Sequence, residues 1–377
     1  MRTMSLTTRR TLLKAGVAAI AAPWIVRDAF ASSGELNFMG WSGFDLKQVF
    51  INFTAKTGIK MNFAAEPDNN TIFAQAKLAA QMGGIDCLEP SLDVLPAYLA
   101  ADLLQPWDNV KIGLENFEPA LVTGEIAKRS LANGRRWFPS VWTAETLVFD
   151  TAQNPQAYGT ASLADLFDPK NEAKVTVRPH SALAALGRVL DAQGKLPMPF
   201  LDGYKSDESM TKVWDVILAE AINAKRNFAR FWSLEPEAEA AFTGDGCTLG
   251  LCWQQTGLNL QAAGSPVAAV APKEGAFAGA QGFVLMKNAK NADQAHAWVK
   301  YIASPEGGAA YAKAFAANPA AKGAVDKSAP AFASFFKEAY PDDALTRLWW
   351  WPPQSGSVLK LRSDYAARLV AAWKAKS

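Results

Sequence analysis

Short apolar runs alternate along most of the chain with longer stretches whose apolar residues recur at helical spacing. Residues 36–39 and 59–64 are apolar runs of strand length, and residues 45–56 between them have the periodicity of an amphipathic helix. A chain in which strands and helices take turns in this way folds as an α/β protein with mostly parallel sheets flanked by helices. Because a single hydrophobic core seldom grows beyond about 250–300 residues, the 377 residues predict two lobes. Residues 136–141 and 146–150 are expected to be two strands that link one lobe to the other.

Two strand ends, far apart in the sequence, carry a tryptophan followed by small or amide residues. The sequence GWSGF follows the apolar run 36–39, and GLCWQQ spans the end of the run 248–252. In an open α/β sheet, ligands bind at the carboxyl edge of the strands, where diverging loops leave a crevice. We therefore expect a ligand cleft between the two lobes, with Trp41 and Trp253 among its walls.

Residues 1–31 have the features of an export signal. TTRRTLLK carries twin arginines ahead of a modest apolar run at residues 15–26, and residues 29–31 form an A-x-A cleavage site. The run is shorter than the roughly 20 residues that a membrane-spanning helix needs. TTRRTLLK resembles the twin-arginine (Tat) signal, and Sec export stays open as the alternative. Since no cysteine follows the cleavage site, we expect the mature protein to begin near Ser32, free in the periplasm.

The basic character of the chain belongs to this leader. Residues 1–31 hold five basic residues and one acidic residue, a net charge of +4, whereas the whole chain is +2, which leaves −2 for residues 32–377. No basic stripe indicates a nucleic-acid partner.

The sequence contains no recognisable motif for catalysis or metal binding. Cys247 and Cys252 lie in one predicted strand, which at ~3.3 Å per residue holds them roughly 16 Å apart, too far for a disulfide. Together with Cys87 they are expected in the interior. With two histidines and no C-x-x-C, neither a metal site nor a cofactor is expected. A nucleophile normally needs a base, usually histidine, and neither His180 nor His296 stands in a catalytic motif. We expect a binding protein, not an enzyme.

The thirteen tryptophans are more than core packing usually requires, and several follow predicted strands. Such rings can form a cage for an ammonium group. The candidate ligand-binding residues, taken from strand ends and from the aromatic run before Pro352, are Trp41, Ser42, Phe44, Ser91, Asp93, Trp142, Arg178, His180, Trp232, Trp253, Gln254, Gln281 and Trp350. Each of the three charged or titratable candidates has two possible roles. Asp93 either faces an amine of the ligand or caps a helix, and Arg178 either binds a carboxylate of the ligand or forms an internal ion pair. His180 either contacts the ligand or packs in the core.

Several stretches carry a family resemblance: LNFMGWSGFDLKQVFINFTAKTGIKMNF, IDCLEPSLDVLPAYLAADLLQPWD, ASLADLFDP, GLCWQQTG, VAAVAPKEGAF and GFVLMKNAKNADQAHAWVKYIASPEGGAAYA. They resemble the family-1 extracellular solute-binding proteins of ABC importers, in particular the spermidine/putrescine-binding branch. The resemblance implies a type II fold in which two lobes close on a small solute and then dock on a membrane permease. It places the first lobe at residues 32–141 and 254–303 and the second at residues 142–253 and 304–377. We expect the protein to be a monomer.

The resemblance also assigns site residues. Aromatic positions that wall the polyamine site fall on Trp41, Trp232 and Trp253, and a polar position falls on Ser91. Positions where the family has acidic or tyrosine side chains hold Gly43, Phe44, Arg178, Pro179, His180 and Gln281, and one carboxylate is regained at Asp93.

These replacements bear on the ligand. Burying an unpaired ammonium group costs several kcal/mol, which disfavours a multiply charged polyamine. A zwitterionic amino compound of the γ-aminobutyrate type suits the sequence better, with Asp93 or the aromatic rings for its amine and Arg178 for its carboxylate. A polyamine-like solute stays the alternative.

Two other functions remain open at this stage. The same fold carries a thiaminase-type enzyme with a cysteine nucleophile, for which Cys87 beside Glu89 is the candidate. The protein can also be the ligand-binding partner of a sensor.

Overall fold

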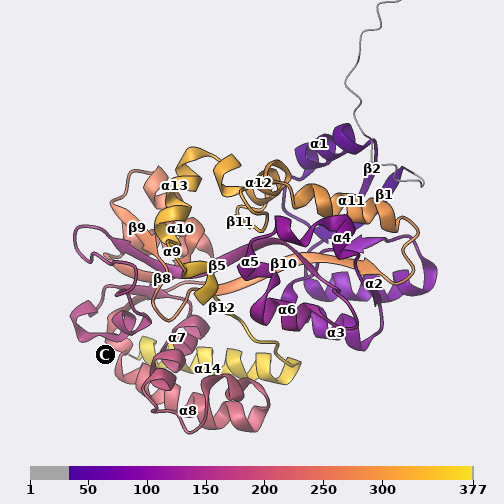
Figure 1. Cartoon of the computed structure of the whole chain (residues 1–377). Helices are drawn as coiled ribbons and strands as arrows, with labels where there is room; N and C mark the ends of the chain where they lie inside the picture. The colour runs from indigo at the N-terminus through magenta and orange to yellow at the C-terminus, as the bar shows by residue number, and fades with distance from the viewer. Residues whose placement is uncertain (1–33, 376–377) are drawn as a thin grey trace, which may run out of the picture. The chain divides into compact units, whose positions relative to one another are not determined.

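A continuous path of hydrogen-bonded strands runs through the protein (Figure 1). The structure is a computed structural model that describes residues 34–375, so the predicted export signal lies outside the described residues. Along the path the strands are β2 (Lys60–Glu66), β1 (Glu35–Trp41), β3 (Cys87–Leu88), β10 (Phe277–Met286), β5 (Phe138–Asp150), β8 (Leu249–Trp253), β6 (Val175–Val177) and β7 (Phe228–Phe231). Four short strands pair with β5 or β10 at the side: β4 (Leu104–Gln105), β9 (Val267–Val270), β11 (Asn318–Pro319) and β12 (Trp349–Trp350).

The strands at each end of this path pair in parallel, and the strands in the middle pair antiparallel. Strand β1 pairs in parallel with β2 and β3, and β6 pairs in parallel with β7 and β8. Between these groups, β5 and β10 run antiparallel to each other, and β10 continues to β3 while β5 continues to β8. We call β1–β4 with the helices packed on them the first half, and β6–β8 with theirs the second half. The expected α/β class is confirmed.

One prediction about the linking strands is wrong. Residues 138–141 and 146–150 belong to one 13-residue strand, β5, and not to two, and residues 136 and 137 precede it. The pattern suggested a break because polar and aromatic side chains interrupt the apolar run. In the structure Trp142 and Glu145 are nevertheless buried, and both lie within the ladder opposite Ala280 and Phe277 of β10.

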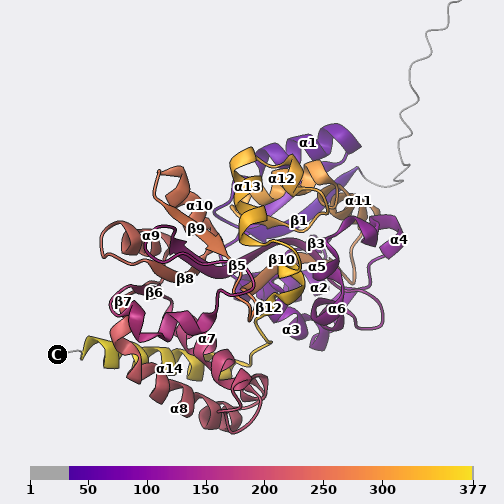
Figure 2. The ribbon, with the colours of Figure 1, turned by 60° about the vertical axis from the view of Figure 1, so that its left-hand side comes forward.

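Helices cover both halves. Their bounds are α1 (Lys47–Thr57), α2 (Asn69–Met82), α3 (Leu95–Ala100), α4 (Asn109–Ile112), α5 (Pro119–Val122), α6 (Gly124–Ser130), α7 (Pro179–Ala192), α8 (Asp207–Asn223), α9 (Glu235–Thr243), α10 (Gln254–Ala262), α11 (Ala292–Ile302), α12 (Pro305–Ala314), α13 (Pro330–Ala339) and α14 (Gly356–Lys374). Helices α7, α8 and α14 pack together on the second half, as Figures 1 and 2 both show. Helix α10 packs on α9 and β9, and α12 packs on α11 and α1. The lobe boundaries at residues 141/142, 253/254 and 303/304 stay a prediction.

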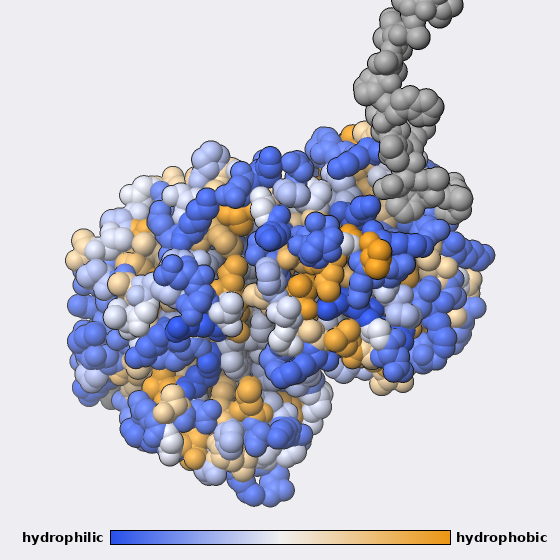
Figure 3. Space-filling model, in the orientation of Figure 1, coloured by the Kyte–Doolittle hydropathy of each residue, from blue (hydrophilic) through white to orange (hydrophobic). Residues whose placement is uncertain are grey.

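Burial follows the expected amphipathic patterns. Helix α1 buries Val49 and Phe53 and ends at Gly58, whose positive φ of 76° is a conformation that glycine adopts without strain. Trp298 of α11 packs edge-on against Phe53 with ring centroids 5.1 Å apart, in the core of the first half. The face shown in Figure 3 is mostly hydrophilic, with hydrophobic side chains in small patches. Within residues 34–375, no helix is long and apolar enough to cross a membrane.

Candidate functional site

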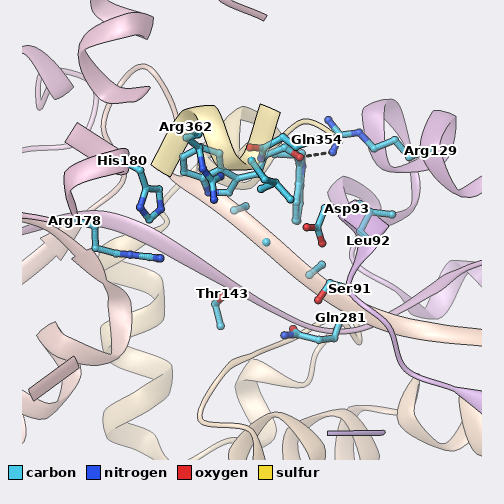
Figure 4. A pocket seen from close by; sticks show the side chains of 16 residues that line it. Ser91, Leu92, Asp93, Arg129, Thr143, Arg178, His180, Gln281, Gln354 and Arg362 are labelled. Carbon is cyan, nitrogen blue, oxygen red and sulfur yellow. Dashed lines mark hydrogen bonds between the residues drawn. The ribbon is translucent and has the colours of Figure 1, made fainter. Parts of the chain in front are cut away.

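A cavity of about 250 Å³ lies where both halves meet β5 and β10 (Figure 4). It is lined by Ser91, Leu92, Asp93, Arg129, Thr143, Arg178, His180, Ala278, Gly279, Ala280, Gln281, Trp350, Trp351, Gln354, Leu359 and Arg362. The first half contributes the start of a 3-10 turn at Leu92–Val94 and helix α6, and the second half contributes the start of α7 and helix α14. A molecule bound in this cavity therefore contacts both halves.

Arg178, at the start of α7, is held by the protein itself. Its Nη1 donates a hydrogen bond of 2.8 Å to Oε1 of Glu145 on β5. The rings of Trp232 and Trp253 lie 5.4 and 5.2 Å from its guanidinium carbon, within cation–π range. The two rings contact each other edge to face, and the Trp232 N–H donates to the carbonyl of Leu251. The aromatic pair expected to hold a ligand ammonium thus holds a cation of the chain.

Glu145 is the buried partner of this arginine. The residue is only 3% exposed, and burial raises the pKa of its carboxyl while the positive charge of Arg178 opposes that rise. Cross-strand pairing sets the geometry, because Glu145 lies opposite Trp253 in the β5–β8 ladder. The internal ion pair that the sequence left open for Arg178 is therefore present.

Two more arginines line the cavity, and neither has a carboxylate within ion-pair distance among the described residues. Arg129 of α6 donates a 2.7 Å hydrogen bond from Nη1 to the carbonyl of Trp351. The guanidinium carbon of Arg362, on α14, lies 5.3 Å from the centroid of the Trp351 ring. Burial lowers the pKa of both arginines, yet arginine stays charged near neutral pH. The cavity consequently has a positive wall.

Asp93 and His180 complete the titratable groups of the cavity (Figure 4). Partial desolvation at the cavity raises the pKa of the Asp93 carboxyl, although the residue stays exposed to solvent, and the charges of Arg362 and Arg129 oppose the rise. Burial, together with the nearby charges of Arg178 and Arg362, lowers the pKa of His180 far below its usual range. His180 is therefore a neutral hydrogen-bonding group, and its ring packs 5.7 Å from that of Trp351.

Uncharged polar groups come from the strands between the halves. Ser91 pairs with Gln281 of β10 in an isolated antiparallel bridge. Asn69 fixes Ser91 from behind, since its Nδ2 donates to Oγ of Ser91 and its Oδ1 accepts from the Ser91 N–H, both at 3.1 Å. Thr143 of β5 lies on the cavity floor in Figure 4. These groups can orient a ligand without adding charge.

The structure brings six of the candidate residues from the sequence to the cavity: Ser91, Asp93, Arg178, His180, Gln281 and Trp350. The remaining candidates do not line it, and these are Trp41, Ser42, Phe44, Trp142, Trp232, Trp253 and Gln254. Of these, Trp232 and Trp253 support Arg178.

The other five candidates have contacts elsewhere in the protein. The Trp41 N–H donates to the carbonyl of Glu89, and the ring of Phe44 stacks on Phe315 with centroids 4.2 Å apart. The exposed Ser42 donates its backbone N–H to the carbonyl of Glu66.

Trp142 and Gln254 are buried structural residues. The Trp142 N–H donates to the Pro319 carbonyl, and the Gln254 amide exchanges hydrogen bonds with the amide of Asn318. For these residues the structure supports packing, the role that the sequence could not distinguish from binding.

Sequence reasoning missed several cavity residues, chiefly Arg129, Thr143, Trp351, Gln354 and Arg362. The two arginines belong to helices, where a charged residue normally faces water, so no local signal marked them. Trp351 belongs to the aromatic run that the sequence did single out.

The arrangement offers binding groups and no catalytic pair. The cavity and its immediate wall hold three arginines against the carboxylates of Asp93 and Glu145, which leaves one surplus positive charge. Cys87 is fully buried, and burial raises the pKa of its thiol well above the usual range, the opposite of what a nucleophile needs. Cys247 and Cys252 are likewise free and buried, as expected. Over residues 34–375, no cluster of His, Cys, Asp and Glu is suited to hold a metal ion.

Comparisons with known proteins agree with a binding role. The family model described as bacterial extracellular solute-binding protein matches residues 48–339. The putrescine-binding periplasmic protein PotF of Escherichia coli is 26% identical over 290 residues, which are 73% of this chain and 75% of PotF. The spermidine/putrescine-binding periplasmic protein of Escherichia coli is 24% identical over 365 residues, 96% of this chain and 98% of that protein.

Solved structures share the fold. The spermidine/putrescine ABC transporter substrate-binding protein PotD from Streptococcus pneumoniae superimposes with a TM-score of 0.70 at 17% identity, covering 90% of this chain and 100% of PotD. A structure described as the Atu4243-GABA receptor gives a TM-score of 0.61 at 19% identity, covering 91% of this chain and 98% of that one.

Proposed function

Since the chain belongs to the family of bacterial extracellular solute-binding proteins, we propose that it captures a small solute between its two halves and delivers it to the membrane permease of an ABC importer. The resemblance, the type II binding-protein fold and the expectation that the chain is not an enzyme are confirmed. We further propose that the leader directs the protein to the periplasm, by the Tat route that TTRRTLLK indicates.

The observation that carries this proposal is the shared lining of the cavity. Side chains from both halves line one cavity, so a solute there adds contacts that exist only when the halves are together. A ligand shifts a conformational equilibrium by its difference in affinity for the two states. Binding should accordingly favour the closed form, the form that a permease can distinguish from the empty protein.

The charge of the cavity bears on which solute is captured. The named relatives bind putrescine or spermidine, which carry two or more positive charges and would add to the surplus positive charge here. We propose instead a zwitterionic amino compound, because a carboxylate can pair with the arginine wall and an amine with Asp93. A polyamine-like solute is the alternative among nitrogenous solutes.

Thermal denaturation of the purified protein with individual solutes tests the binding role. A ligand at 100 times its Kd stabilises the folded state by about 2.7 kcal/mol, which raises Tm measurably. Cells that lack this chain should also lose saturable uptake of the same labelled solute. Binding with unchanged uptake would contradict delivery to a permease and point to the sensor partner. Failure of all amino compounds to bind would contradict the proposed class of solute, and failure of every solute would contradict the binding role.

A further inference from the structure

We infer that the recognised group of the solute is a carboxylate that binds at Arg362, in a cavity whose positive wall also includes Arg129, while Arg178 is retained for the protein's own ion pair. The inference rests on the proposed function, because it concerns how the same cavity selects its ligand. It also reassigns the carboxylate from Arg178, the residue that the sequence suggested.

Arg178 is already engaged within the protein. Its charge is paired with Glu145 at 2.8 Å, and its guanidinium carbon lies 5.4 and 5.2 Å from the ring centroids of Trp232 and Trp253. Its side chain lines the cavity but is only 26% exposed. A ligand carboxylate at Arg178 would have to compete with a buried carboxylate that is already in place.

The site that would suit a ligand ammonium is occupied by Arg178. Two indole rings and a carboxylate form the kind of cage that attracts such a group. Here that cage, formed by Trp232, Trp253 and Glu145, already contains the guanidinium of Arg178. An ammonium from outside would have to displace Arg178 or lie against its positive charge, so the cage selects against amines.

The two remaining arginines of the cavity have N–H donors to spare. Arg362 has no hydrogen bond or ion pair within residues 34–375, and Arg129 uses one N–H on a neutral carbonyl. Trp351 positions both, because its carbonyl accepts from Arg129 and its ring lies against Arg362. Guanidinium groups with free N–H donors match the two oxygens of a carboxylate.

The charges that line the cavity do not balance. After Arg178 and Glu145 neutralise each other, Arg129 and Arg362 face the single carboxylate of Asp93. One ligand carboxylate balances the remaining positive charge. Helices α6 and α14 belong to different halves, so this group draws on both of them.

Three straight-chain solutes that share four methylene groups separate the possibilities: 1,4-diaminobutane, 5-aminopentanoate and adipate. Calorimetric titration of the purified protein should show binding of 5-aminopentanoate, adipate or both, and an affinity for the diamine about a hundredfold weaker than for the better carboxylate ligand. Binding of the diamine with the highest affinity would overturn the inference and leave the proposed function intact. If none of the three binds, the inference is wrong, and the proposed function is decided separately by thermal denaturation with the wider set of solutes.

Variants of α14 locate the carboxylate. Arg362→Gln should weaken binding of the carboxylate ligand by roughly ten- to a hundredfold, with little change in the affinity for the diamine. Arg368→Gln is the matched control, because Arg368 lies on the same helix, is 57% exposed and does not line the cavity. Melting temperatures of both variants exclude unfolding. Equal affinities of Arg362→Gln and Arg368→Gln for the carboxylate ligand would overturn the inference.

Discussion

Replacing Arg178 by alanine tests whether this residue belongs to the protein's own architecture. The change leaves Glu145 buried without its cation and leaves Trp232 and Trp253 facing an empty space. Breaking a buried ion pair by removing one partner costs about 3–5 kcal/mol, and each lost cation–π contact adds about 0.5–2 kcal/mol. Because Arg178 is partly exposed and Glu145 can take up a proton, we expect a net loss of about 3 kcal/mol in the free energy of unfolding.

The loss should depend on pH in a definite direction. Burial already raises the pKa of Glu145, and Arg178 opposes that rise. In the Arg178→Ala variant the pKa should rise further, so the folded state retains a proton that the unfolded chain releases. Stability then falls as pH increases, and the difference from wild type should be larger at about pH 8 than at about pH 5.

Urea unfolding of a double-mutant cycle measures this directly. Adding Glu145→Gln to Arg178→Ala should recover part of the lost stability, since the uncompensated charge is removed. Low millimolar guanidinium should also stabilise Arg178→Ala, whereas urea at the same concentration should not. Arg368→Ala is the control, because Arg368 forms an exposed ion pair with Asp215. This substitution should lower the free energy of unfolding by no more than about 1 kcal/mol. A loss that is the same at both pH values, and that Glu145→Gln does not reduce, would refute the reasoning.

Two further predictions concern buried groups of the first half. Glu89 accepts hydrogen bonds from Ser140 and Tyr311, and burial raises its pKa to about 8. The free energy of unfolding of the wild type should therefore fall as pH increases from about 4.5 to about 8. Urea unfolding of Glu89→Gln should show a flatter dependence on pH. A steeper or unchanged slope in the variant would mean that Glu89 is already ionised in the folded protein. Burial, with the negative charges of Glu89 and Asp86 nearby, raises the pKa of the Cys87 thiol, so a thiol reagent should label Cys87 only at the rate of unfolding. Labelling on mixing would contradict its inert, buried state.

Local patterns were sufficient for the elements of the fold. The apolar runs at residues 36–39 and 175–177 lie within or coincide with β1 and β6, and the periodic stretch 45–56 contains most of α1. Such patterns report which face of an element is buried. They failed in β5, where Trp142 and Glu145 are buried through contacts with distant strands.

The site depended on long-range register that the sequence does not display. Arg178 could be read as a carboxylate-binding residue or as one half of an ion pair, and only the position of Glu145, opposite Trp253 in the ladder, decides between these. Arg362 lies on the C-terminal helix and reaches a cavity whose other wall begins at Ser91. Its exposure to the cavity follows from how α14 packs on α7 and α8.

A crystal structure of the complex with 5-aminopentanoate tests the central claim most directly. The account predicts the ligand in the cavity between the halves, its carboxylate oxygens within hydrogen-bond distance of the Arg362 guanidinium, and Arg178 still paired with Glu145. An ammonium group seated against Trp232 and Trp253, with Arg178 displaced from Glu145, would contradict it.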